Sequence, residues 1–440
     1  MTTIPIFLAV LGLLVVAHEL GHFAIAKLAK VKVIEFGVGY PPRLWAFTRG
    51  ETTYSINLLP LGGYVRMLGE EDPEHEQSFA RRSAMTRLAV LFAGPAMNAI
   101  LPIFLLTIVF MMPQSVVETN VTVLEVAAGS PAADSGVLPG DIIRESGGRT
   151  MHNSGDLIQS VQRRLGAGTT WVVERGGRLH QLSLVPRFDP PEGQGATGIV
   201  LTDARVTVAS VQQGSPAADA GLQRGDLFLR IANAPTIDQQ ASRVLRAQGA
   251  EEAAAVAFAE SPNDPVAVDV LRAGTIVRLI VPPEAGELTG YTADVRPEST
   301  RSEPVWRAVT ASIQQIVDIL VMFRNEISKW IAGSGEVQFS GPVGIARITG
   351  EVASAGLSPL ITWTALLSIN LAIVNLLPIP ALDGGRITFI LVELARGGRR
   401  LAPSKERVVH IVGFAVLIAM IIVISVNDIQ RILGGAEPFG

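Results

Sequence analysis

The chain has 440 residues, of which 48% are hydrophobic and 17% are charged. Its mean hydropathy of +0.37 is high for a wholly soluble protein, and its net charge of −4 gives no reason to expect a nucleic-acid partner. There is no cysteine, which excludes disulfides and thiolate metal ligands and leaves His, Asp and Glu as candidate ligands. The composition indicates a membrane protein that carries a sizeable soluble part.

Four stretches are apolar enough to cross a bilayer, which takes about 20 residues in a helix. They lie near Ile4–Ala26, Leu88–Met112, Leu357–Ile379 and Val408–Val426. The first stretch lacks the basic start of a signal peptide, so we expect a retained helix. Lysine and arginine gather between the first and second stretches and between the third and fourth, which predicts that both loops are cytoplasmic. Both ends and the long central region are then expected on the other side.

The first stretch, in the predicted transmembrane segment 1–27, contains the zinc-protease signature His18-Glu19-Leu20-Gly21-His22. Residues four apart share one face of a helix, so His18 and His22 can hold one metal ion through their imidazoles. Glu19 lies beside them, where a carboxylate can take a proton from water at the metal. A chance match is the alternative. Because two histidines and a carboxylate are costly in lipid, we favour a functional metal site.

Segment 28–87 is predicted to be a cytoplasmic loop with a membrane-associated β-hairpin, followed by the second transmembrane helix at 88–112. Thr53–Leu58 alternates as a strand does, and a second run begins at Gly62-Gly63-Tyr64-Val65, after Pro60. We interpret the two runs as a hairpin whose edge can pair with an unwound substrate through Gly62, Gly63, Tyr64 and Val65. A plain cytoplasmic hairpin is the alternative.

An internal repeat dominates the central region. Gly129-Ser130-Pro131-Ala132-Ala133-Asp134 recurs as Gly214-Ser215-Pro216-Ala217-Ala218-Asp219, and each copy continues to a Gly-Asp turn between two β-like runs. This pattern resembles bacterial PDZ domains in tandem, over 117–203 and 204–284. Such domains bind an extended peptide at a sheet edge, and a structural or size-filtering role is the alternative.

Residues 303–356 are predicted to form an amphipathic region next to the membrane. Apolar side chains recur at helical spacing over Val305–Ala332, with Trp306 and Trp330 near the two ends. A helix in the membrane interface is one interpretation, and a helix packed on the PDZ pair is the other.

A catalytic zinc site normally needs a third protein ligand and one open position. The third span, over 357–386, ends in Pro378-Ile379-Pro380-Ala381-Leu382-Asp383-Gly384-Gly385, where the prolines stop a helix and the glycines allow a tight turn. Asp383 is the strongest candidate, because the predicted topology gives it the same side and a similar depth as His18 and His22. An ordinary helix end is the alternative.

Other polar residues near the spans are weaker candidates. Asn375 lies one or two turns before Asp383 and can hydrogen-bond the substrate backbone or the developing oxyanion, or contact a neighbouring helix. The remaining histidines lie in a polar loop, in the PDZ region, or at the start of the fourth span, 408–427; they are His75, His152, His180 and His410.

On these motifs the chain resembles the site-2 protease family of intramembrane zinc metalloproteases, in particular its bacterial regulator-of-sigma-E type with tandem PDZ domains. The resemblance rests on His18–His22, Phe36–Tyr40, Pro60–Val65, Phe92–Asn98, Ser340–Ala346 and Asn375–Gly385. It implies zinc held by His18, His22 and Asp383, with Glu19 as the catalytic base. It also implies single-span substrates already trimmed on the outer side, such as anti-sigma factors and remnant signal peptides, in the bacterial inner membrane.

We therefore expect a multi-pass α-helical membrane protein with four transmembrane helices, a membrane-associated β-hairpin and two inserted PDZ-like α+β domains. The expected function is cleavage of transmembrane segments near the cytoplasmic face. Its partners are transmembrane protein substrates and the lipid bilayer, with peptide ligands of the PDZ domains as further candidates.

Two other classes of function compete with this one. A membrane-anchored PDZ adaptor with a non-catalytic zinc site calls for a closed four-ligand site, and no credible fourth ligand is visible. A metal transporter calls for ligands at mid-membrane on several spans, and the second and fourth spans offer almost none.

Overall fold

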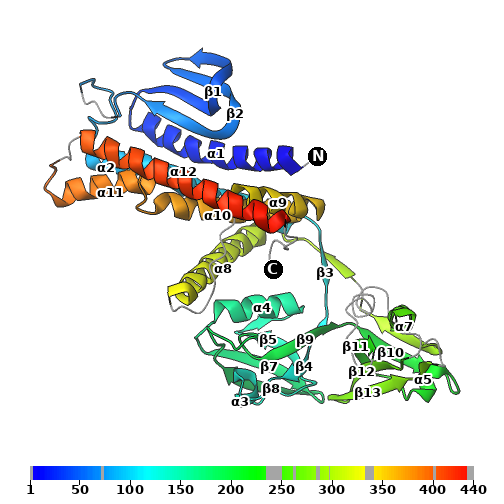
Figure 1. The fold of residues 1–440 in the computed structure, drawn as a ribbon. Coiled ribbons are helices and arrows are strands. Elements are labelled where there is room, and N and C mark those ends of the chain that lie inside the picture. The colour runs from blue at the N-terminus through cyan, green and yellow to red at the C-terminus, as the bar shows by residue number, and fades with distance from the viewer. Residues whose placement is uncertain are drawn as a thin grey trace. The chain divides into compact units, whose positions relative to one another are not determined.

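The computed structural model describes residues 3–70, 74–233, 250–260, 264–283, 288–296, 298–331, 341–399 and 403–433, so Ser340 of the family motif lies outside the described residues. The chain forms two compact units. One comprises Met1–Met112, Ser302–Ile319 and Val337–Gly440, and the other Pro113–Arg301 and Leu320–Glu336. The first unit contains a bundle of helices and one sheet, and the second contains the remaining sheets (Figure 1).

The helix bundle of the first unit is built around α2 (Ala84–Met111), which packs against α1 (Thr3–Leu28), α10 (Leu357–Leu376) and α11 (Asp383–Ala395) (Figure 1). A glycine brings α1 and α2 close together at the depth of the zinc-protease signature. A Cβ added at Gly21 would lie 2.1 Å from the carbonyl oxygen of Ala93 on α2, so no larger residue fits there. The unit also contains α9 (Pro342–Ser354) and α12 (Pro403–Leu433).

Five helices of the described residues are long and apolar enough to cross a membrane, so the predicted count of four is not confirmed. Four of the five correspond to the predicted spans. The additional one is α8 (Val305–Ile331), with a hydropathy of 1.2 against 1.7 to 2.8 for the others. The sequence predicts this segment as an amphipathic helix beside the membrane. Length and composition alone do not separate such a helix from a span, because both expose apolar side chains to lipid.

The predicted third span, 357–386, is two helices rather than one. α10 ends at Leu376, and α11 begins at Asp383. Pro378 and Pro380 lie between them, and proline lacks the N–H that a continuing helix needs. Asp383 therefore opens a helix, and the loop Leu377–Leu382 determines where its carboxylate lies.

Two long strands form the sheet of the first unit: β1 (Val33–Arg49) and β2 (Thr52–Met67). They are joined by a turn in which Gly50 has a φ of +62°, a left-handed conformation that glycine adopts without strain. The predicted hairpin between Thr53–Leu58 and Gly62–Met67 is therefore wrong, because both runs belong to β2 and pair with β1.

The first part of β1, Val33–Val38, lies between the two halves of β2, Thr52–Leu59 and Gly63–Met67. Phe36, for example, pairs with both Tyr54 and Val65. The rest of β1 pairs only with the first half of β2, which leaves Gly63–Met67 with a strand partner on one side only among the described residues. This second half of β2 is an open edge of the sheet, and β2 packs against α1 (Figure 1).

The second unit contains two sheets with the same order of strands, β8-β7-β5-β4-β9 and β13-β12-β11-β10-β14. The second sheet passes the predicted boundary at 284, because β14 pairs with β10 as β9 pairs with β4. The strands are β4 (Asn120–Val126), β5 (Ile142–Ser146), β7 (Thr169–Arg175), β8 (Arg178–Leu184), β9 (Ile199–Ala204), β10 (Val206–Val211), β11 (Leu227–Asn233), β12 (Val266–Arg272), β13 (Thr275–Val281) and β14 (Tyr291–Val295), with the short β6 (Arg149–Thr150) on β5. A separate pair is formed by β3 (Gln114–Val117) and β15 (Glu298–Arg301), and the helices are α3 (Pro131–Asp134), α4 (Ser154–Arg163), α5 (Pro216–Asp219) and α7 (Ala250–Glu260).

The repeated Gly-Asp turn has a structural role in both copies. Asp141 and Asp226 are fully buried, and each forms an ion pair with an arginine of a neighbouring strand, Arg175 at 2.6 Å and Arg272 at 2.7 Å. A buried carboxylate without its cation is strongly destabilising, so this pairing explains why the motif occurs twice. By itself the repeat motif points to no ligand.

Candidate active site

The three candidate metal ligands come together in the first unit. His18 and His22 lie one turn apart on α1, and Asp383 is the first residue of α11. Oδ2 of Asp383 lies 3.0 Å from Nε2 of His18 and 3.2 Å from Nε2 of His22, and the two Nε2 atoms are 3.1 Å apart. Ligands about 2.0–2.1 Å from one tetrahedral zinc ion are about 3.4 Å from each other. The cluster therefore fits a single ion with little adjustment.

Hydrogen bonds from α2 orient the two imidazole rings. Nδ1 of His22 donates to the carbonyl oxygen of Val90 at 2.8 Å, and in the neutral ring this leaves Nε2 as the nitrogen that can bind a metal. Nδ1 of His18 lies 3.2 Å from the side-chain amide of Asn98. Asn98 is fully buried, and its Oδ1 has no hydrogen-bond partner among the described residues. Turning this amide by 180° brings Oδ1 to Nδ1–H of His18, which satisfies both groups and frees Nε2 of His18 for a metal.

A glycine leaves room for the metal between the rings and α2. A Cβ added at Gly94 would lie 2.2 Å from Nε2 of His22 and 2.8 Å from Nε2 of His18. The sequence places Gly94 and Asn98 only within the family resemblance and assigns them no role. Their spacing of four residues puts both on one face of α2, and this spacing is the signal that predicts a shared contact.

Glu19 lies beside the ligands and against the open edge of the sheet. It is half-buried, and its carboxylate interacts with the backbone N–H of Val65. A Cβ added at Gly63 would lie 3.1 Å from Cγ of Glu19 and 2.9 Å from Val15. The N–H of Val65 thus belongs to the row of edge groups that points away from β1 and toward the candidate catalytic residues.

Three of the five predicted substrate-binding residues lie on this edge, Gly62 directly precedes it, and Asn375 lies on another element. Gly62, Gly63, Tyr64 and Val65 are consecutive in β2. Asn375 lies half-buried in the last turn of α10 and makes no hydrogen bond to the three candidate ligands, all of which are described residues.

A buried carboxylate that the sequence analysis did not single out holds the sheet together. Glu35 of β1 is 2% exposed and accepts hydrogen bonds from Ser55 at 2.8 Å and Tyr64 at 2.9 Å. Arg43 and Arg66 form ion pairs with it at 2.6 Å and 3.0 Å. Burial alone would raise the pKa of Glu35, but the hydrogen bonds from Ser55, Tyr64 and Arg43 lower its pKa below the ordinary value. The charged carboxylate therefore ties β1 to both halves of β2.

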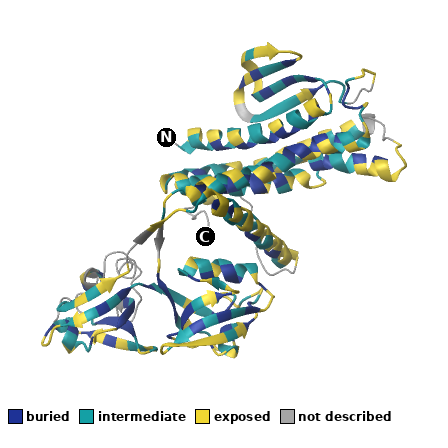
Figure 2. Ribbon diagram, turned by 180° about the vertical axis from the view of Figure 1, so that it is seen from behind, coloured by how far each residue is buried: buried dark blue, intermediate teal, exposed yellow. Residues whose placement is uncertain are grey.

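Much of the outer part of the same sheet is exposed (Figure 2). Its exposed residues include large apolar ones. A patch of this kind on a protein surface marks a contact with lipid or with another protein. Its members are Tyr40, Leu44, Trp45, Phe47, Ile56, Leu58 and Leu59.

A family model described as peptidase family M50 matches residues 6–420. The chain belongs to peptidase family M50, the site-2 protease family. The M50 peptidase is similar along nearly its whole length to proteins named as zinc metalloproteases. Zinc metalloprotease RasP of Geobacillus kaustophilus is 30% identical, with 97% of each chain covered. Zinc metalloprotease RasP of Oceanobacillus iheyensis is 28% identical, with 98% of this chain and 100% of the relative covered.

A third relative of the M50 peptidase is the regulator of sigma-E protease RseP of Escherichia coli, which is 28% identical, with 97% of this chain and 98% of the relative covered. The family and the shared names identify the M50 peptidase as a zinc metalloprotease of the site-2 type, and its apolar helices make it a membrane protein. Among solved structures, a PDZ domain of an SdrC-like protein from Listeria monocytogenes matches 19% of this chain and 87% of its own, with 25% identity and a TM-score of 0.17. That score assigns no fold, so the PDZ-like nature of the two repeats stays a prediction.

Proposed function

We propose that this M50 peptidase cleaves the transmembrane segments of single-span membrane proteins, inside the bilayer and near its cytoplasmic face. The observation that carries the proposal is the meeting of His18, His22 and Asp383 beside Glu19, with both histidines inside a helix long enough to span a membrane. Within the described residues this is the one group of three or more potential metal ligands, and it has no fourth member. Three ligands and an open position favour catalysis over the closed site that a PDZ adaptor would need.

His18, His22 and Asp383 are the proposed zinc ligands. Zinc bound there supplies a Lewis acid that polarises the scissile carbonyl and makes water more acidic. The ring orientations set by Val90 and Asn98 keep both Nε2 atoms directed at the metal position.

Glu19 is the proposed general base and acid. Its carboxylate takes a proton from the attacking water and then gives it to the amine that leaves when the peptide bond breaks. The carboxylate lies between the metal ligands and the open edge, where the N–H of Val65 and the backbone of Gly63 are its neighbours. The carboxylate of Glu19, which transfers the proton, therefore lies where water and substrate are proposed to meet.

The open edge Gly63–Met67 is the proposed partner of the substrate backbone. A transmembrane helix satisfies its own backbone groups, and unwinding it in lipid leaves them without partners. An edge strand beside Glu19 can supply those partners, and Gly62 and Gly63 keep side chains out of the way. Asn375, just before the loop that carries Asp383, is proposed as a further hydrogen-bond donor to the substrate backbone.

Pairing with the edge predicts that blocking single backbone N–H groups of the substrate affects binding at every second residue. In a synthetic transmembrane substrate with single N-methyl groups placed along the cleaved segment, alternate positions should raise KM about tenfold, because each removes a hydrogen bond to the edge. The intervening positions should leave KM nearly unchanged. The measurement is a steady-state cleavage scan in detergent. A helical period, or equal effects at all positions, would contradict pairing with a strand.

Anti-sigma factors and remnant signal peptides, already trimmed on the outer side, are the proposed substrates. The E. coli relative is named as a regulator of sigma-E protease, which supports the first class. The basic residues of the two loops support a bacterial inner-membrane topology with the active site near the cytoplasm and the tandem repeats outside. In that position the repeats can bind peptide or exclude bulky uncut substrates.

Cleavage by the purified protein tests the function directly. Incubation with a single-span substrate in detergent should give two products cut within the apolar segment. Removal of metal with a chelator should lower the rate at least 100-fold, because the bound metal supplies the electrophile and the acidified water. One equivalent of zinc should restore the rate. Cleavage that persists at full rate after the metal content has fallen to zero would exclude the proposed site.

A further inference from the structure

The loop Leu377–Leu382 adopts a conformation that its own sequence does not favour. Ala381, two residues before Asp383, has a φ of +79°. Residues with a Cβ avoid this left-handed region, and they adopt it where surrounding structure holds them there. The position of the Asp383 carboxylate therefore depends on contacts that the loop receives from elsewhere.

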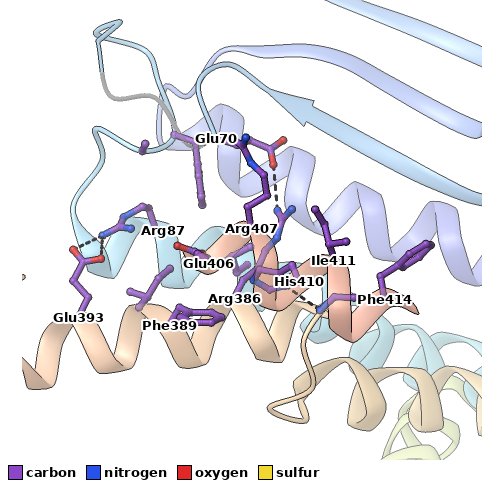
Figure 3. A pocket seen from close by; sticks show the side chains of 15 residues that line it. Glu70, Arg87, Arg386, Phe389, Glu393, Glu406, Arg407, His410, Ile411 and Phe414 are labelled. Carbon is purple, nitrogen blue, oxygen red and sulfur yellow. Dashed lines mark hydrogen bonds and ion pairs between the residues drawn. The ribbon is translucent and has the colours of Figure 1, made fainter. Parts of the chain in front are cut away.

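A histidine of α12 provides one such contact. The backbone N–H of Ala381 donates to Nδ1 of His410 at 2.9 Å. An Nδ1 that accepts a hydrogen bond is unprotonated, so this interaction needs the neutral ring with its proton on Nε2. The ring also packs against Phe389 of α11, with 5.4 Å between the ring centres. His410 thus contacts both the loop and the helix that starts at Asp383, in the wall of a cavity of about 380 Å³ (Figure 3).

A glycine of α12 contacts the same loop. A Cβ added at Gly413 would lie 2.3 Å from Cβ of Pro380 and 3.0 Å from its carbonyl carbon and oxygen. Since residues three apart share one face of a helix, His410 and Gly413 form a single contact surface for Pro380 and Ala381.

Much of α12 lies on the surface of the described part of the chain. Its most apolar stretch has no buried residue, so general packing contributes little to its position. Asp428 anchors the far end, where it accepts hydrogen bonds from the backbone N–H groups of Gly341 and Gly344 at 2.9 Å each. His410 and Gly413 contact the loop at the other end, near Asp383.

We propose that His410 is a positioning residue of the protease, which holds Ala381 in its left-handed conformation and so fixes the Asp383 carboxylate beside His18 and His22. This inference rests on the proposed role of Asp383 as a metal ligand. Through it, α12 takes part in building the zinc site although it contributes no ligand. Loss of the acceptor at Nδ1 lets the loop relax and withdraws the carboxylate from the metal position.

The test compares two substitutions of His410 in the full-length protein. His410→Leu removes the acceptor and keeps the volume, whereas His410→Asn places an amide oxygen close to the position of Nδ1. We expect His410→Leu to weaken zinc binding about tenfold, measured by chelator competition, and to lower kcat while KM changes less than twofold. His410→Asn should restore both zinc affinity and kcat to within about threefold of the parent. Parent-like zinc affinity in His410→Leu, or equal losses in both variants, would overturn the proposal.

Gly413→Ala is an independent test in case His410→Leu does not fold. Alanine favours a helix more than glycine does, so a purely structural effect predicts an equal or higher Tm. The positioning role predicts weaker zinc binding at that same Tm, with Val423→Ala, at a strongly exposed position of α12, as the control. Asp383→Asn distinguishes a failure of the ligand assignment from a failure of the positioning role of His410. If Asp383→Asn keeps its zinc, the ligand assignment fails; if it loses zinc while His410→Leu and Gly413→Ala keep theirs, only the positioning role fails.

Discussion

Replacing Glu19 with glutamine is expected to abolish cleavage and to leave zinc bound. Glutamine has the shape of glutamate but accepts no proton at neutral pH, so the attacking water loses its base and the leaving amine its acid. The expected fall in kcat is about 10⁴-fold, the upper range for loss of general acid–base catalysis. His18, His22 and Asp383 are untouched, so zinc content should stay at the parent value. Cleavage of a single-span substrate and elemental analysis of the same sample measure both quantities.

Glu51→Gln is the matched control for this variant. Glu51 lies in the turn between β1 and β2, where its side chain is 54% exposed, and the same chemical change there should leave kcat unaltered. Parent-level cleavage by Glu19→Gln would remove the proposed base. Loss of zinc from Glu19→Gln would instead make Glu19 part of the metal site.

The second large effect is expected from the smallest change, Gly94→Ala. The new methyl group would lie 2.2 Å from Nε2 of His22, well inside van der Waals contact and on the side of the rings that faces the metal. Zinc content should therefore fall close to zero and cleavage should be lost with it. Helix stability should not fall for intrinsic reasons, because alanine is favoured over glycine in a helix by about 1 kcal/mol.

Gly12→Ala is the control for Gly94→Ala. A Cβ at Gly12 of α1 meets nothing within 4 Å, so this variant should bind zinc and cleave as the parent does. The comparison uses zinc content, kcat and Tm for all three proteins. A Gly94→Ala protein with full zinc content would mean that the ligands converge on a different point from the one proposed.

The parts of the site that follow from local spacing could be predicted from the sequence. His18, Glu19 and His22 needed only the period of a helix. Asp383 needed topology as well, since its side and depth had to match those of a segment far away in the chain. The structure brings its carboxylate within 3.2 Å of both histidines.

The parts that depend on long-range packing could not be predicted in the same way. The partner of Gly62–Val65 is β1, whose glycines and prolines hide the strand pattern, so the sequence favoured a hairpin within β2. The contact of His410 with Ala381 joins a helix to a distant loop, and no spacing within one segment reveals it; for Asn98 the spacing from Gly94 indicates a shared face of α2 but does not identify His18 as the partner. The break in the third span could be predicted only in part. Pro378 and Pro380 are visible in the sequence, but the start of α11 at Asp383 is not.

The buried charge of Glu35 determines how β1 aligns with β2. Shifting β1 by one residue against β2 would turn this carboxylate to the opposite face and separate it from Ser55, Tyr64 and Arg66 of β2, an arrangement too costly to be populated. The sheet therefore has one permitted alignment, in which the N–H of Val65 faces Glu19. In the proposed pairing of substrate with this edge, the ion pairs of Glu35 thus determine which peptide bond of the substrate lies at the proposed metal position.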